Sequence, residues 1–211
     1  MAEKPILFNI EMVKAILEGR KTQTRRILKN DKIQARPTAT AITIDAPYRT
    51  FLWHPMYCYK PETVRAPYQY GDVLWVREAF CPIRYKKPKK SIPVDFREND
   101  FLYKADEIAR SDGKPIKWRP SIHMPREAAR LFLRVTSVRL ERLQDISSSD
   151  VDAEGCKEYA YDVITGEMMQ SRPTWFKILW DKTIQKADLP RYGWDANPWV
   201  WVIEFERCDR P

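Results

Sequence analysis

The pattern of apolar and polar positions near the start of the chain predicts a helix followed by a strand. Four apolar residues recur at helical spacing: Ile10, Val13, Ile16 and Leu17. Asn9 is suited to cap this helix, and Gly19 stands where a left-handed residue ends many helices. The following segment KTQTRRIL (21–28) alternates in polarity, which indicates a strand or a loop that enters one.

Three later segments have the pattern of strands. In YGDVLWVREAF (70–80) a Gly-Asp turn precedes an apolar run, and in LFLRVTSVRLERL (131–143) apolar and polar residues alternate. The segment NPWVWVIEFER (197–207) is apolar at successive positions, so we expect a strand that is buried on both faces.

Two further helices are predicted in the second half of the chain. In DISSSDVDAEGCKEY (145–159), Ser147 is the expected N-cap, Asp150 follows three residues later, and Gly155 ends the helix. The second helix carries Phe176, Leu179, Trp180 and Thr183. Together these elements predict a mixed α+β fold with a small antiparallel β-barrel or curved sheet and flanking helices.

The domain organisation expected from the sequence is a single domain over residues 1–211 with two large insertions. The first insertion, residues 31–69, contains five prolines among scattered aromatic residues, so we expect an irregular segment packed on the surface of the main fold. The second covers residues 82–117 and includes a basic, proline-interrupted loop.

Composition favours an anionic partner and gives no sign of a metal site. Lys and Arg number 37 against 29 for Asp and Glu, a net charge of +8. The four cysteines form no CxxC pair and the chain has two histidines, so we expect free thiols, no metal and no cofactor. Charged residues interrupt the N-terminal segment and no apolar run approaches a membrane span, which predicts a cytoplasmic protein. The oligomeric state stays open.

A basic cluster follows the first predicted helix. Residues 20–36 contain seven Lys or Arg and a single acidic residue, Asp31. A groove lined in this way would attract a nucleic-acid backbone without reading its sequence. The alternative is a strand whose threonines satisfy β-propensity and whose cations face solvent.

Four segments in order resemble the ASCH domain of the PUA-like superfamily: ILEGRKTQTRR, YGDVLWVRE, DISSSDVDAEG and WVWVIEFE. With WRPSIHMPR between the second and third segments, the chain resembles the larger members carried by bacterial prophages. The resemblance implies a curved β-barrel with a cleft beside the first helix that holds RNA or a nucleotide. One bacterial branch of the family hydrolyses the acetyl amide of N4-acetylcytidine, and another cleaves single-stranded RNA.

The resemblance implies a catalytic set of Lys21, Thr24 and Glu154. A lysine serves as a base only if its pKa falls from about 10 towards 7–8, and a threonine hydroxyl is a weak nucleophile without such a base. In a regular strand Lys21 and Thr24 would point to opposite faces about 10 Å apart, so their convergence requires a bend after Gly19. The alternative for Glu154 is a surface carboxylate at a helix end.

Further residues are candidates for ligand binding. Around the predicted pocket these are Arg20, Thr22 and Arg26; elsewhere they are Glu78, Trp118, Arg119, His123 and Arg126. Glu78 either faces the same cleft or pairs with Arg77 or Arg126.

In WRPSIHMPR, Trp118 suits base stacking, and Arg119 or Arg126 suits phosphate. The alternative is a proline-rich loop anchored in the core by Ile122 and Met124, with His123 as a hydrogen-bonded structural residue.

The sequence therefore predicts a protein that binds RNA or a modified nucleoside or nucleotide, with a pocket able to hydrolyse an N4-acylcytidine-type amide. Two alternatives remain at this point. One is a nucleic-acid-binding module without catalysis, and the other is a phage accessory protein that acts through protein partners.

Overall fold

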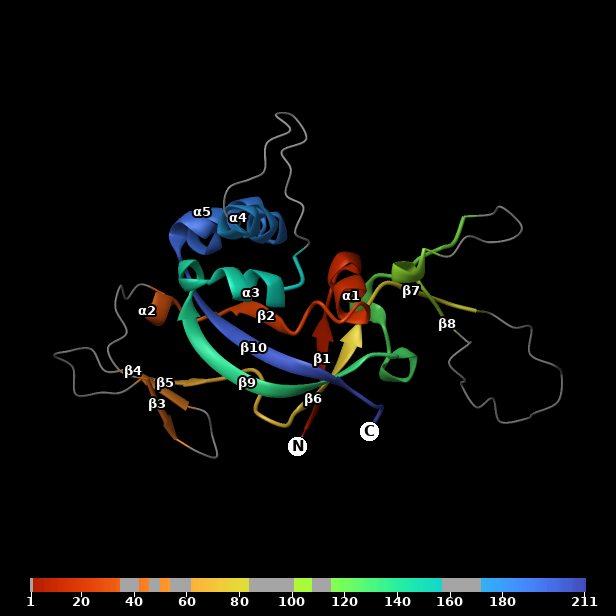
Figure 1. Cartoon of the computed structure of the whole chain (residues 1–211), viewed down its shortest axis with the longest axis horizontal. Helices are drawn as coiled ribbons and strands as arrows, with labels where there is room; N and C mark the ends of the chain where they lie inside the picture. Colours follow the sequence, from red (N-terminus) through yellow and green to blue (C-terminus); the bar gives the residue numbers. More distant parts are fainter. Residues whose placement is uncertain are drawn as a thin grey trace. The chain divides into compact units, whose positions relative to one another are not determined.

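The structure is a computed structural model, shown in Figure 1. It describes residues 2–34, 42–45, 50–53, 62–83, 101–107, 115–156 and 172–211. The chain divides into two compact units. The first unit comprises Met1–Gly19, Asp72–Arg134 and Glu206–Pro211, and the second comprises Arg20–Gly71 and Val135–Phe205.

The main sheet has five strands in the order β1-β6-β9-β10-β2. Their bounds are β1 Glu3–Leu7, β2 Gln23–Ile27, β6 Val73–Arg77, β9 Phe132–Arg142 and β10 Trp199–Cys208. The pairs β6–β9 and β10–β2 are antiparallel, whereas β1 and β6 are parallel. The α+β class is confirmed, but the expected antiparallel sheet is wrong because the unpredicted strand β1 makes the sheet mixed. The closed barrel stays a prediction.

In the first unit, helix α1 (Ile10–Leu17) begins and ends as predicted. The side chain of Asn9 accepts a hydrogen bond from the Met12 amide at 2.9 Å, and Gly19 has a φ of 75°. Strands β7 (Phe80–Pro82) and β8 (Phe101–Tyr103) pair in an antiparallel manner. The core of this unit lies between these strands and the start of β9; its buried members are Val73, Phe80, Tyr103, Met124, Ala128, Ala129 and Phe132.

In the second unit, helices α3 (Ser148–Ala153) and α4 (Arg172–Thr183) pack against each other (Figure 1). The predicted capping box of α3 is present, since Ser147 and Asp150 exchange hydrogen bonds between side chain and backbone. The short helices α2 (Asp31–Gln34) and α5 (Leu189–Tyr192) belong to the same unit. The buried core contains Leu143, Ile146, Val151, Phe176, Trp180, Val200 and Val202.

The first insertion contains regular structure that the sequence did not predict. Strands β3 (Ile42–Asp45), β4 (Thr50–Trp53) and β5 (Glu62–Arg65) form a three-stranded antiparallel sheet. The expectation of an irregular segment is therefore wrong. The five prolines lie before, between or after these strands in sequence, so they mark connections rather than an absence of strands.

The described part of the chain contains no helix that is both long enough and apolar enough to cross a membrane. The basic loop at 84–90 and the residues His54 and Cys58 lie outside the described residues. The three described cysteines, Cys81, Cys156 and Cys208, are free thiols.

Candidate functional site

Lys21 and Glu154, which lie far apart in the sequence, meet inside the second unit. The Lys21 ammonium donates hydrogen bonds to the Glu154 carboxylate at 2.8 Å, to the Glu154 carbonyl at 2.9 Å and to the Gln23 carbonyl at 2.7 Å. Its side chain is 0% exposed and that of Glu154 is 6% exposed. Backbone pairing of the two residues, together with a bond from the Thr22 amide to the Ala153 carbonyl, holds the segment before β2 against the end of α3.

Glu154 is positioned by the way in which α3 ends. It is the C-terminal cap residue of this helix, and Gly155 follows with a φ of 81°, a conformation that favours glycine. Its second carboxylate oxygen accepts from the Arg25 guanidinium at 3.2 Å. The Glu154 carboxylate is therefore held between an ammonium and a guanidinium, both buried.

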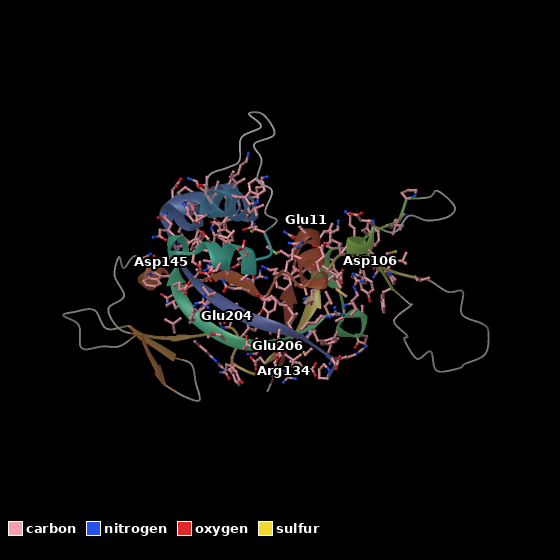
Figure 2. All side chains as sticks on the ribbon, in the orientation of Figure 1. Glu11, Asp106, Arg134, Asp145, Glu204 and Glu206 are labelled. Atoms are coloured by element: carbon pink, nitrogen blue, oxygen red, sulfur yellow. The ribbon has the colours of Figure 1, made fainter. Side chains whose placement is uncertain are left out.

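Arg25 continues this cluster into a wider network of ion pairs. Its other terminal nitrogen lies 3.3 Å from Glu141 and 3.4 Å from Asp150. Arg139 contacts both of these carboxylates and also Glu204, which Figure 2 labels on β10. Two cations of the predicted basic cluster, Lys21 and Arg25, are thus buried against carboxylates and do not face solvent.

The environment of Lys21 changes its proton affinity. Burial lowers the pKa of Lys21 because water no longer solvates the charged form; the Glu154 carboxylate opposes this shift, and the positive charge of Arg26 adds to it. Burial likewise raises the pKa of Tyr68, against the opposing effect of Arg26. Arg26 thus interacts electrostatically with both Tyr68 and the buried pair.

Thr24, the third residue of the expected catalytic set, is buried in β2 and pairs with Ile203 of β10. Successive side chains of a strand point to opposite faces. Arg25 reaches Glu154, so alternation directs the side chains of Thr24 and Arg26 to the other face of β2. The structure brings Lys21 and Glu154 together, and strand geometry separates the Thr24 side chain from that of Arg25.

The remaining candidates of the second unit flank the buried pair. Arg20 donates to the Gly155 carbonyl, next to Glu154. Thr22 is exposed, and its carbonyl accepts from the Phe205 amide at 2.9 Å. Sequence reasoning missed Tyr68 because it lies in an insertion without a periodic pattern. It placed Arg25 near Lys21 but missed its contact with Glu154, because adjacent arginines were not assigned to opposite faces.

Glu78 belongs to the first unit and has a different partner from those expected. It is buried, and Arg130 binds its carboxylate through two nitrogens at 2.9 and 3.0 Å. Burial raises the pKa of Glu78, and the hydrogen bond from Arg130 opposes the shift. Arg126 pairs with Glu3 instead. The expected pairing of Glu78 with Arg77 or Arg126 is therefore wrong.

The segment 118–126 also lies in the first unit. Trp118 is half-buried, Arg119 is exposed, and the backbone of Arg119 bonds to that of Phe80 at 2.7 and 3.2 Å. Met124 is buried as a core anchor, whereas Ile122 is 59% exposed. His123 is exposed, and its backbone amide donates to the Pro120 carbonyl at 3.0 Å.

No family model matches the chain. No curated protein matches it either. Among solved structures, the ASCH domain from Lactobacillus crispatus JV V101 is similar, with 12% identity and a TM-score of 0.40; the match covers 98% of this chain and 79% of that chain.

Proposed function

We propose that this protein binds RNA or a modified nucleoside at the Lys21–Glu154 site, as an ASCH-type, PUA-like protein. The observation that carries the proposal is the buried contact between the Lys21 ammonium and the Glu154 carboxylate at 2.8 Å. It joins the two sequence segments, GRKTQT and DVDAEG, that resemble the ligand-binding elements of that family.

The energetics of this contact favour a functional role. Removing two opposite charges from water has a desolvation cost of several kcal/mol for each ion, and well-packed apolar residues would often stabilise a fold as well or better. Ionisable groups with perturbed pKa values cluster at functional sites. The Lys21–Glu154 pair fits this description, because burial lowers the pKa of Lys21 and the Glu154 carboxylate is held between two cations.

The groups around the pair suit a pyrimidine nucleoside. A carboxylate such as Glu154 accepts a hydrogen bond from the amino group of cytosine. An aromatic ring such as Tyr68 can stack on a base, and the Arg20 guanidinium, which donates to the Gly155 carbonyl next to Glu154, can contact phosphate. Arg26 leaves β2 on the opposite face and acts on the pair through its charge. Tyr68 is half-buried and interacts with Arg26, which in turn interacts with the Glu154 charge.

A catalytic form of this proposal uses the Glu154 carboxylate and the Lys21 ammonium, which are in contact at 2.8 Å. In it, Glu154 takes a proton from water, the hydroxide attacks the acetyl carbon of an N4-acylcytidine, and the proton passes to the departing amine to give a carboxylic acid and cytidine. Lys21 stabilises the oxyanion. Water is favoured over Thr24 as the nucleophile because alternation along β2 directs the Thr24 side chain to the face opposite Arg25.

The proposal is tested with labelled single-stranded RNA, by fluorescence anisotropy, and with N4-acetylcytidine, by chromatographic detection of cytidine. The variants are Lys21→Ala and Glu154→Gln, with Lys117→Ala as a control that removes an exposed cation. Loss of RNA binding in the first two variants alone supports the site, and unchanged binding in both contradicts it. Cytidine formed by the wild type and not by Glu154→Gln supports catalysis.

The same experiment separates the alternatives. RNA binding without cytidine formation favours a module that does not break bonds. Failure of the wild type to bind either probe favours a protein that acts through protein partners.

A further inference from the structure

The first unit contains a cavity that lies apart, in sequence, from all the residues of the Lys21–Glu154 site. Its volume is about 470 Å³, within the range of pockets that hold small ligands. Residues from β8, from the start of β9 and the segment before it, and from the end of β10 and the segment after it line this cavity. Every lining residue belongs to the first unit, so the cavity can be described without reference to the second.

Three aromatic side chains line the cavity: Phe101, Tyr103 and Phe132. Tyr103 and Phe132 are buried in the core of the unit, and the Tyr103 hydroxyl donates to the Ala128 carbonyl at 2.8 Å. The Arg130 guanidinium lies 4.0 Å from the centre of the Tyr103 ring. Packing, a hydrogen bond and a cation–π contact therefore hold this part of the wall rigid.

Arg130 does not provide the charge that a bound anion requires. Its nitrogens bind Glu78 at 2.9 and 3.0 Å and Asp106, labelled in Figure 2, at 2.8 Å. Two carboxylates already neutralise this guanidinium. Its role is to fix the position of the aromatic wall.

Two other arginines carry the positive charge at the edge of the cavity. Arg207 and Arg210 are both exposed and both line it. The Arg210 guanidinium lies 5.9 Å from the centre of the Phe132 ring, so it stands next to the aromatic wall. The carboxylates of Glu127 and Asp209 line the same cavity and provide hydrogen-bond acceptors.

We infer that this cavity is a second binding site, for a purine or cytosine nucleotide with a single phosphate. Phe101, which is half-buried whereas the other two rings are buried, stacks on the base, because stacking needs only a flat apolar face. Arg207 and Arg210 bind the phosphate, and a carboxylate of the rim accepts from the amino group of the base. The ligand is either a free nucleoside monophosphate or one nucleotide of a single strand, which have the same chemistry.

The test measures binding of AMP, adenosine and a short oligoadenylate to the full-length protein by isothermal titration calorimetry. The variants are Arg207→Ala/Arg210→Ala and Phe101→Leu, with Lys117→Ala as the charge control. Loss of both arginines should weaken AMP binding at least about tenfold and leave adenosine binding unchanged, because only AMP carries the phosphate. Phe101→Leu should weaken both, because it keeps an apolar side chain but removes the ring.

Cys208 supplies a reporter inside the cavity itself. It lines the cavity and is half-buried, and Cys81 and Cys156, also half-buried, do not line it. AMP should protect Cys208 from alkylation by N-ethylmaleimide, measured by peptide mass spectrometry, while the rates at Cys81 and Cys156 stay unchanged. Tighter binding of oligoadenylate than of AMP identifies a strand as the ligand, and equal affinity identifies the free nucleotide.

The inference is overturned if AMP does not bind the wild type, if it binds without protecting Cys208, or if Lys117→Ala weakens it as much as loss of the two arginines. Lys21→Ala distinguishes the two sites. It should abolish binding at the Lys21–Glu154 site and leave AMP binding in this cavity intact, so either proposal can fail without the other.

Discussion

Replacing Lys21 with methionine removes the buried ammonium and keeps most of the hydrocarbon stem. In the wild type this ammonium donates to three oxygens at 2.7, 2.8 and 2.9 Å from a side chain that is 0% exposed. The variant leaves the Glu154 carboxylate buried, with the Arg25 guanidinium still bound to it at 3.2 Å. It also leaves two carbonyl groups without this donor.

The expected loss of free energy of unfolding depends on the partners that Glu154 keeps after the substitution. Removing one partner of a buried ion pair typically costs about 3–5 kcal/mol, because the other charge stays buried and uncompensated. Arg25 compensates part of the Glu154 charge, so we expect the lower end, about 3 kcal/mol in the free energy of unfolding. Adding Glu154→Gln removes the uncompensated charge, and Arg25 keeps Glu141 and Asp150 as partners. The double variant should therefore be more stable than Lys21→Met by about 1 kcal/mol or more.

The assay is urea unfolding at pH 7, followed by circular dichroism and by tryptophan fluorescence. Trp180 in the core of the second unit and Trp194 packed against it contribute to the fluorescence, together with Trp75 of the first unit. Lys14→Met is the matched control, since the half-buried Lys14 pairs with Glu107, whose side chain is 74% exposed. This control should change the stability little. If Lys21→Met destabilises the protein no more than Lys14→Met, or if the double variant is the least stable of the three, the buried-pair reasoning is refuted.

Three further predictions concern the elements around this pair. Ser147→Ala removes the cap of α3 and should cost about 1 kcal/mol by the same unfolding assay, whereas Ser147→Asp, which can still cap, should cost less. Burial raises the pKa of Asp150, but hydrogen bonds from Ser147 and the charge of Arg25 outweigh it and lower the pKa to about 2. Because the pKa is lower in the folded state, the contribution of Asp150 to stability is complete above about pH 4 and is lost as the pH falls through 2. The difference in unfolding free energy between wild type and Asp150→Asn should therefore close over that range. A constant difference would contradict this. Burial raises the pKa of Cys156 to about 11; the Glu154 charge adds to this shift and the Lys21 charge opposes it. Glu154→Gln should therefore speed the alkylation of Cys156 at pH 8, and Lys21→Met should slow it. The opposite order of rates would exclude these charges as the cause.

Local sequence signals predicted the elements that depend on nearby residues. Asn9 and Gly19 identified both ends of α1, and Ser147, Asp150 and Gly155 identified α3, because a cap is a contact between residues a few positions apart. The apolar residues at successive positions 199–203 likewise identified a strand that is buried on both faces.

The sequence did not predict what depends on distant partners. Strand β1 contains Pro5 and a short apolar run, and it is stabilised by parallel pairing with β6, about 70 residues later. Strands β3, β4 and β5 were hidden by the prolines around them. Periodicity gives no information about which arginine pairs with Glu78, because that choice depends on how the chain folds between Glu78 and Arg130.

The sequence predicted only part of the candidate site, because the remaining contacts depend on residues that are distant in the chain. The resemblance of two segments suggested that Lys21 and Glu154 meet, and the structure brings them together. It could not show that Arg25 shares the carboxylate, or that the lysine is held by two carbonyl groups as well. Those contacts depend on the geometry of the chain where β2 begins and α3 ends.

The most direct test of the central claim is a calorimetric titration of N4-acetylcytidine into the wild type, Glu154→Gln and the exposed control Glu206→Gln. A nucleoside without phosphate probes base recognition separately from charge attraction. We predict saturable binding to the wild type and to Glu206→Gln, and none to Glu154→Gln. Equal affinity of all three proteins for the nucleoside would contradict a ligand site at the Lys21–Glu154 pair.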